Sequence, residues 1–552
     1  MIARAGGVAP PEVVASGFGW TYAGRPSPAL SGLTFRLPPG SVLLVLGPSG
    51  SGKSTLARAL AGIVPHALRG RWEGRLAVGA QEVPNTAPAR LGERVGIVFQ
   101  DPESQLVMPR VEDELAFGLE NRGWSRSVML DTVPRALRQV GLSGFEPRLT
   151  QALSGGEQQR LAIADVLAPL PGCIVLDEPT ANLDPPGMAA VFEVLRALAA
   201  ERRHTIVIVE HRVEAALPLA DLVLILDEAG RQIAFGPPAE VGPRHAATLE
   251  RSGGWVPGAW LGGATDGHGW SAGRSRVAGG GRPAGGRLPQ HPVVEARGVV
   301  VRNPAETPGS WRTALDGVGL RLEPGERVAL VGPNGSGKST LLSVLAGLRR
   351  PDSGAVRVGG GRAEPATDPS RLRSDHLADL IGLLFQDPEL GFVAPTVGRE
   401  AVARAARRRG RQGISPTAVL ARFGLAGSDD RNPYQLSQGE QRRLSLAAYA
   451  LDPPAILLLD EPTFGLDRLG AERVLGLLDE ASGGGQAQLL ASHDPRLLPA
   501  CDRVVALESG RVVFDGAVAE FLAAPPYRPA EPWRSGVAVT GAEMPGSSRA
   551  VL

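Results

Sequence analysis

Two short phrases contain the only lysines of the chain. They read GPSGSGKST and GPNGSGKST, and they place Lys53 and Lys338 285 positions apart. Glycines at this spacing let successive backbone N–H groups turn toward phosphate oxygens, while the lysine neutralises the phosphates. A codon bias toward arginine explains the other 56 basic residues, but not why both lysines fall in the same phrase. The phrases therefore predict two phosphate-binding loops.

Each loop supplies a complete set of nucleotide-binding residues. The lysines are expected at the β- and γ-phosphates, and the hydroxyls of Ser54 and Ser339 at a magnesium ion. The first set is Gly47, Pro48, Ser49, Gly50, Ser51, Gly52, Lys53, Ser54 and Thr55. The second set is Gly332, Pro333, Asn334, Gly335, Ser336, Gly337, Lys338, Ser339 and Thr340.

An acidic pair follows an apolar run in both parts of the chain, in the phrases VLDEPT and LLDEPT. Asp177 and Asp460 would hold Mg²⁺, and the adjacent Glu178 and Glu461 would orient or deprotonate the attacking water. An exposed acidic strand end is the alternative, which the upstream phosphate loops disfavour. The pattern predicts hydrolysis of a nucleoside triphosphate.

A histidine follows a later apolar run in each part. His211 and His493 lie 33 and 32 residues beyond the paired glutamates. A lone histidine at a strand end is most often structural, but this repeated spacing favours a contact with the γ-phosphate. We therefore count both histidines with Glu178 and Glu461 as catalytic residues.

The whole pattern is written twice, which indicates a tandem duplication. FQDPE recurs, and LSGGEQQR in the first half matches LSQGEQRR in the second. We predict a first domain over 11–240, a linker over 241–292, a second domain over 293–525 and a disordered tail over 526–552. The linker is rich in glycine and proline, yet its phrase WVPGAW is expected to dock against the protein.

Each half is expected to have an α/β fold. Residues 41–47 and 327–332 predict strands that lead into the phosphate loops, with a helix after each loop. CIVLD and ILLLD are short apolar runs typical of a parallel sheet. The stretches VEDELAFGLENRGW and DTVPRALRQVGL predict a helical insert between them.

Composition excludes several other classes. A net charge of +1 argues against a nucleic-acid binder. Two isolated cysteines are too few for a disulfide framework or a zinc site, which favours a cytoplasmic protein. No run approaches the 18 apolar residues of a membrane span. A membrane role would therefore need a partner chain.

The motif order resembles the nucleotide-binding domains of ABC ATPases over about 230 residues of each half. The resemblance implies tandem P-loop domains, each with a mainly parallel β core, an antiparallel β subdomain and a helical subdomain that carries the signature motif. It implies that Gln100 and Gln386 touch Mg²⁺ and report on a membrane partner. Asp184 and Asp467 would be D-loop residues, and Tyr22 would stack on adenine.

The same resemblance implies a head-to-tail sandwich formed within one chain, with two composite ATP sites. The signature motif of each half would close on the ATP of the other half, its helix N-terminus aimed at the γ-phosphate. The site of Lys338 would use Ser154, Gly156 and Glu157. The site of Lys53 would use Ser437, Gly439 and Glu440. Gln438, which replaces Gly155 of the first copy, is expected to be harmless.

The two sites are nevertheless not identical. Asn303 stands where the resemblance expects an aromatic residue, and four extra residues precede the shared Ala314. Trp311 is a candidate substitute. We predict unequal nucleotide affinity at the two sites.

The residues around and beyond the first FQDPE indicate the task of the ATPase. The stretch FQDPESQLVMPRVEDELAFGLENRG is similar to ATPases of energy-coupling factor importers for vitamins and metal ions. This resemblance implies a transmembrane subunit at the Q-loop regions, a small substrate-binding membrane component and a peripheral place on the cytoplasmic face of the membrane. Two alternatives stay open, an ATPase of a conventional binding-protein-dependent importer and a soluble ribosome-associated ABC protein.

Overall fold

The structure is a computed structural model. It describes residues 8–181, 183–260, 293–304, 311–359, 367–406, 415–463, 465–466, 468–483 and 485–523. The predicted tail, Asp467 and residues 261–292 of the predicted linker lie outside these ranges.

The first half is built on two sheets, with strand orders β2-β1-β4-β5 and β10-β9-β3-β8-β7-β6. The smaller sheet is antiparallel, and the larger is parallel except for β10. The strands of the first half are β1 (Val13–Tyr22), β2 (Leu30–Leu37), β3 (Val42–Leu46), β4 (Gly70–Val78), β5 (Gln81–Glu82), β6 (Val95–Val98), β7 (Cys173–Asp177), β8 (Thr205–Val209), β9 (Leu222–Leu226) and β10 (Gln232–Gly236).

The second half repeats this plan, with strand orders β12-β11-β14 and β15-β16-β17-β13-β18-β19. Its strands are β11 (Val294–Pro304), β12 (Trp311–Leu322), β13 (Arg327–Val331), β14 (Ser353–Val358), β15 (Ile381–Leu384), β16 (Ile456–Asp460), β17 (Ala487–Ala491), β18 (Arg503–Glu508) and β19 (Arg511–Ala517). In both halves the strand before the phosphate loop is central and fully buried, because elements cover both faces of the sheet.

Helices flank the sheets, and a helical insert follows β6 and β15. The first half contains α1 (Lys53–Leu60), α2 (Ile63–His66), α3 (Pro88–Gly92), α4 (Val111–Glu120), α5 (Arg126–Gln139), α6 (Gly155–Leu167), α7 (Pro185–Glu201), α8 (Val213–Ala216) and α9 (Pro238–Arg251). The second half contains α10 (Lys338–Leu345), α11 (Ser374–Leu380), α12 (Val397–Ala406), α13 (Pro416–Arg422), α14 (Gln438–Ala450), α15 (Arg468–Gly483) and α16 (Val518–Ala523).

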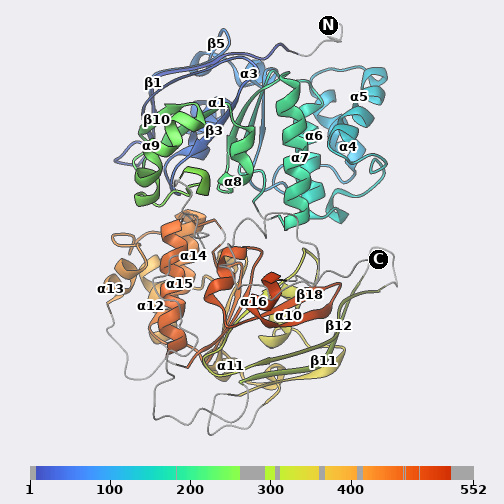
Figure 1. Ribbon diagram of the computed structural model, residues 1–552, viewed down its shortest axis with the longest axis vertical. Helices are drawn as coiled ribbons and strands as arrows, with labels where there is room; N and C mark the ends of the chain where they lie inside the picture. Colours follow the sequence, from blue (N-terminus) through green and yellow to red (C-terminus); the bar gives the residue numbers. More distant parts are fainter. Residues whose placement is uncertain are drawn as a thin grey trace, which may run out of the picture.

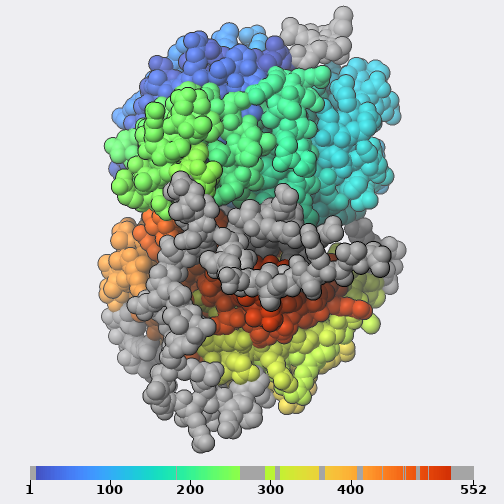
Figure 2. Space-filling view, in the orientation of Figure 1, coloured from blue at the N-terminus to red at the C-terminus, as the bar shows by residue number. Residues whose placement is uncertain are grey.

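The two halves stack as separate lobes along the long axis of the molecule (Figure 1). Figure 2 shows the blue-to-green surface of the first half above the orange-to-red surface of the second. The predicted fold class is confirmed in both, including the antiparallel sheets and the helical inserts. Helix α9 crosses residue 240, where the sequence prediction ended the first domain, and packs on β9 and β10.

No helix in the described part of the chain is both long and apolar enough to cross a bilayer. The longest α-helix of the described residues, α7, has 17 residues, and it carries buried positions on one side and exposed ones on the other.

Candidate functional site: two phosphate loops and a cavity between the halves

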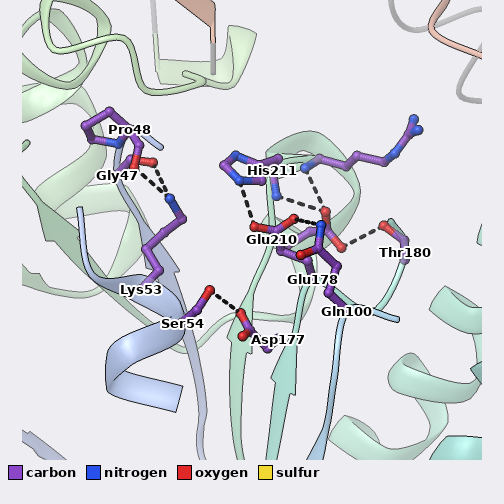
Figure 3. A network of polar contacts seen from close by, with 11 residues as sticks. Gly47, Pro48, Lys53, Ser54, Gln100, Asp177, Glu178, Thr180, Glu210 and His211 are labelled. Atoms are coloured by element: carbon purple, nitrogen blue, oxygen red, sulfur yellow. Dashed lines mark hydrogen bonds and ion pairs between the residues drawn. The ribbon is translucent and has the colours of Figure 1, made fainter. Parts of the chain in front are cut away.

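The phosphate loops join a central strand to the start of a helix in both halves. Lys53 is the first residue of α1, and its Nζ donates to the carbonyl oxygens of Gly47 at 2.9 Å and Pro48 at 2.8 Å (Figure 3). Lys338 begins α10 and donates to the corresponding carbonyls of Gly332 and Pro333 at 2.8 and 3.0 Å. Both ammonium groups are therefore buried at the centre of a curled loop whose backbone shape is the same in the two copies.

One position in each phosphate loop requires glycine because of its backbone conformation and its close neighbours. Gly52 has φ +87°, and a Cβ there would lie 2.3 Å from the carbonyl oxygen of Ala29. Gly337 has φ +105°, and a Cβ would lie 2.5 Å from the oxygen of Ala314. No other residue tolerates both the left-handed backbone and this close approach.

Two of the three predicted magnesium ligands of the first half, Ser54 and Asp177, meet where β7 ends, and the third, Gln100, donates to Glu178. The Ser54 hydroxyl donates to Asp177 Oδ1 at 2.9 Å (Figure 3), and a hydrogen bond from Ser339 reaches Asp460 in the second half. Burial raises the pKa of Asp177 to about 6, helped by Glu178 and opposed by Ser54, Arg58 and Lys53. These oxygens fit a hard cation that takes its remaining ligands from water and phosphate. The described residues contain no cluster of three acidic, histidine or cysteine side chains that could hold a metal alone.

Both predicted catalytic glutamates have a left-handed backbone. Glu178 has φ 52° and Glu461 has φ 50°, a region that non-glycine residues rarely occupy. The N–H of each glutamate donates at 2.9 Å to the last residue of the neighbouring strand, Val209 or Ala491. This bond holds the strained turn, and such strain is typical of functional positions.

In the first half, the glutamate is paired with its histidine. His211 Nε2 lies 3.0 Å from Glu178 Oε1, and Gln100 donates to Glu178 Oε2 at 3.0 Å (Figure 3). Burial opposes ionisation of Glu178, but the charge and hydrogen bond of His211 and the charge of Lys53 outweigh it and lower the pKa of this carboxyl. The first glutamate is thus held ionised.

In the second half, the glutamate has different partners. The Ser492 hydroxyl donates to Glu461 Oε2 at 2.8 Å, and the His493 backbone N–H donates to Oε1 at 3.0 Å. The His493 ring is 3.7 Å from Glu461 Oε1, longer than a hydrogen bond. Burial raises the pKa of Glu461 to about 7, whereas burial, Lys338 and Arg212 lower the pKa of His493 well below its ordinary value.

The residue before each histidine accounts for part of the difference between the partners of Glu178 and those of Glu461. Glu210 accepts from Thr180 at 2.6 Å and from the His211 N–H at 2.8 Å, so it holds its own loop (Figure 3). Ser492 instead binds the catalytic glutamate. Sequence reasoning gave neither residue a role, although the phrases VEH and ASH already differ at this position.

The signature helices start identically in the two halves. Ser154 caps α6 and forms a reciprocal capping box with Glu157, and Ser437 does the same with Glu440 on α14. Gln438 therefore leaves the start of its helix intact. The carboxylates of Glu157 and Glu440 accept hydrogen bonds from the backbone N–H of their own N-cap serines, at 2.7 and 2.8 Å.

A direct hydrogen bond joins the two halves at the phosphate loop. Asp184 Oδ2 accepts from the N–H of Asn334 in the second loop at 2.9 Å, while its Oδ1 caps α7 through Gly187. Gly156 of the first signature packs on Gly187, where an added Cβ would lie 2.9 Å from the Gly187 Cα. The first signature thus lies beside the D-loop residue that touches the phosphate loop of the other half.

Both halves line one cavity of about 450 Å³. The first half contributes residues that include Glu178 and His211. The second half contributes Gln386, Asp460, Glu461, His493 and six residues of its phosphate loop, Asn334, Gly335, Gly337, Lys338, Ser339 and Thr340. Lys53 and Ser54 are outside this lining, in the network of Figure 3. Ser154, Gly156, Ser437 and Gly439 are likewise outside it.

The residues near the expected base position differ between the halves. The Tyr22 hydroxyl lies 3.1 Å from Thr55 Oγ1, which sets the ring beside the start of α1. In the second half, β11 and β12 extend further, so Asn303 pairs with Arg312, and both line the cavity. Trp311 is 64% exposed and does not line it, so the structure does not support Trp311 as a substitute for the aromatic residue.

Two fused α/β units, each with a phosphate loop, an acidic strand end and a capped signature helix, define a P-loop ATPase with two nucleotide-binding domains. The sequence model of the ABC transporter family matches residues 30–181 and 315–464. The chain therefore belongs to the ABC transporter family, as an ATP-binding and ATP-hydrolysing protein.

Relatives of similar length support this assignment. A protein of Streptomyces coelicolor named as an ABC transporter ATP-binding protein is 37% identical, with 92% of this chain and 94% of the relative covered. A Bacillus subtilis protein named for HMP/thiamine import is 31% identical, with 91% and 90% covered. The solved structure titled RNase-L Inhibitor is similar in fold, with a TM-score of 0.56, 20% identity and 92% of each chain covered.

Proposed function

We propose that this chain powers an energy-coupling factor importer of a vitamin or metal ion, by hydrolysing ATP at two composite sites between its halves. The observation that carries the composite sites is the bond from the Asn334 N–H to Asp184. It connects the first D-loop, and the signature packed behind it, with the phosphate loop of the second half. The full-length likeness to a relative named for HMP/thiamine import supports the transport task.

The chemistry at each site results from the arrangement of its side chains. The loop N–H groups and Lys53 or Lys338 bind the phosphates. Ser54 with Asp177, and Ser339 with Asp460, would hold Mg²⁺, which supplies charge neutralisation when bound. Glu178 or Glu461 orients and deprotonates the attacking water, and His211 or His493 contacts the γ-phosphate. The signature helix of the opposite half closes the site, because its N-terminus favours negative charge.

The segments after the Q-loop glutamines support a membrane partner. Val107 is 63% exposed in the first half, and Leu390 and Val393 are 70% and 69% exposed in the second. A buried glutamate fixes the backbone of each segment. Glu114 accepts from the N–H groups of Val107 and Met108 at 2.9 and 2.6 Å. Glu400 accepts from those of Val393 and Ala394 at 2.9 and 2.7 Å. A firmly held loop with exposed apolar side chains suits a transmembrane subunit. The chain would then lie on the cytoplasmic face of the membrane.

Purification from the native host tests this function. We expect a multispanning membrane protein and a small substrate-binding membrane protein to copurify, and the reconstituted complex to hydrolyse ATP faster than the chain alone. Val107→Glu should weaken this stimulation and leave basal hydrolysis unchanged, because Val107 lies outside the cavity. Copurification with ribosomes would favour the soluble class, and a secreted binding protein would favour a conventional importer.

A further inference from the structure

The segment that leaves α9, residues 252–260, contacts both halves and is here called the clasp. One end is fixed in the first half, where Trp260 is only 6% exposed within the core. Gly242 on α9 makes room for the indole, since a Cβ there would lie 2.0 Å from Trp260 Cε2. Gly254 likewise lies against Leu249, where a Cβ would be 2.2 Å from its Cδ1. The clasp therefore belongs to the first half, in agreement with the expected docking of WVPGAW.

The clasp also binds the helix that begins just after the second D-loop. Arg468, the first residue of α15, donates its backbone N–H to the Gly253 oxygen at 3.1 Å. Its guanidinium donates to the Glu250 oxygen at 2.6 Å. Gly253 has φ +91°, and a Cβ there would lie 3.0 Å from the Leu469 side chain. In Figure 1, α9 lies at the edge of the first half that faces α14 and α15.

A third contact reaches the loop of the second catalytic histidine. The Arg496 guanidinium lies 3.7 Å from the centroid of the Trp255 ring, within the range of a cation–π contact. The same guanidinium binds both carboxylate oxygens of Asp494 at 2.8 and 2.9 Å, and Asp494 directly follows His493. Trp255, Arg496, Asp494 and His493 all line the shared cavity.

The second histidine has more need of such support than the first. His211 is held by Glu178 at 3.0 Å within its own half, but His493 is 3.7 Å from Glu461. We propose that Trp255 is a positioning residue for the second ATP site, which holds the loop of His493 in place through Arg496 and Asp494. The first half thus supplies part of the framework of the second site, in addition to its signature motif. The proposal rests on hydrolysis at the second site.

The test measures each site alone in the full-length chain. The Glu178→Gln variant reports the second site, and the Glu461→Gln variant reports the first. Adding Trp255→Ala to the first of these variants should lower kcat by about tenfold or more, since a displaced catalytic group is costly. The KM for ATP should change by less than about twofold, because Trp255 does not belong to the phosphate loop. Trp255→Phe should restore most of the rate, because a phenyl ring can still stack on Arg496.

Controls separate positioning from a general loss of structure. Trp255→Ala should leave kcat unchanged in the Glu461→Gln background. Arg511→Gln on β19, which breaks an exposed ion pair with Asp316 of β12, should change neither site. An equal loss at both sites, or a change in KM alone, would overturn the positioning role. An inactive Glu178→Gln variant would instead show that the second site does not hydrolyse ATP, and this would overturn the two-site function together with the role of Trp255.

Discussion

At the residue scale, the two predicted catalytic glutamates have the same backbone conformation but different hydrogen-bond partners. Glu178 and Glu461 sit on the same left-handed turn after corresponding strands. Glu178 is bound by His211 and Gln100, whereas Glu461 is bound by Ser492 and a backbone N–H. Burial acts to raise the pKa of both carboxyls. It prevails at Glu461, whereas at Glu178 the charge and hydrogen bond of His211, with the charge of Lys53, outweigh burial and lower the pKa.

Replacing each glutamate separately tests whether both sites are competent. We expect Glu178→Gln and Glu461→Gln each to lower the steady-state ATPase rate, and the double variant to lose about 10²-fold or more, the range ascribed to a general base. Glutamine keeps the size of the side chain but cannot accept a proton. If one of the single changes leaves the rate untouched, that site is idle.

The opposite pKa shifts predict different pH profiles for the two sites. A general base works when ionised, so the second site should gain activity as the pH rises through about 7, the pKa of the buried Glu461. The first site should stay active at lower pH, because the lowered pKa of Glu178 keeps it ionised. Measuring kcat against pH in the two Glu→Gln variants separates the profiles. Superimposable curves would contradict this assignment.

At the element scale, the strand pairs beside the phosphate loops differ between the halves. In the first half, β1 ends at Tyr22, next to Thr55 of α1. In the second, the longer β11–β12 hairpin carries Asn303 and Arg312 at the corresponding edge of the cavity. An aromatic ring can stack on the face of a base without needing matched hydrogen-bond donors and acceptors. An amide and a guanidinium are polar and present a smaller flat surface for stacking.

This difference predicts tighter ATP binding at the first site. Lys338→Ala should leave the first site for measurement and Lys53→Ala the second, each by titration calorimetry. Adding Tyr22→Ala should weaken the first site by about tenfold, as for the loss of one stacked base. Asn303→Tyr should strengthen the second. Two dissociation constants that agree within error would refute the asymmetry.

At the scale of the whole molecule, two sets of contacts between described residues join the halves near the second phosphate loop and the loop of His493. Asp184 contacts the second phosphate loop, and the clasp contacts the start of α15 and the loop of His493. Because both halves belong to one chain, each contact forms at a high effective concentration. The Asp184 contact and the clasp contacts would therefore resist a movement that separates the two halves beside the second site.

Asp184 offers a test of this coupling, since it both caps α7 and binds the second loop. Asp184→Asn should preserve the cap, because asparagine is an equally good N-cap, but lose the charge that favours the Asn334 N–H. Asp184→Ala should lose both. In the Glu178→Gln background we expect both variants to slow second-site hydrolysis, with only the alanine variant also lowering the melting temperature. Unchanged hydrolysis in both variants would remove Asp184 from the second site.

Sequence alone determined the features that depend on local chemistry and on repetition. The phosphate loops, the acidic strand ends and the signature helices result from residue types at fixed spacing, and each appears at the predicted position in its element. The parallel core and the helical inserts result from short apolar runs and helical periodicity. Such patterns can be recognised in the sequence because the geometry of a helix, strand or loop fixes the spacing of the residues that share one face or one turn.

Only the tertiary structure decided which groups meet across large separations. It brought Trp255 to Arg496 and Asp184 to Asn334, and it left Trp311 exposed outside the cavity. It also gave Glu178 and Glu461 unlike partners, although their surrounding phrases are almost the same. Side-chain direction and burial depend on packing between elements distant in sequence, and these set the pKa values and the asymmetry of the two sites.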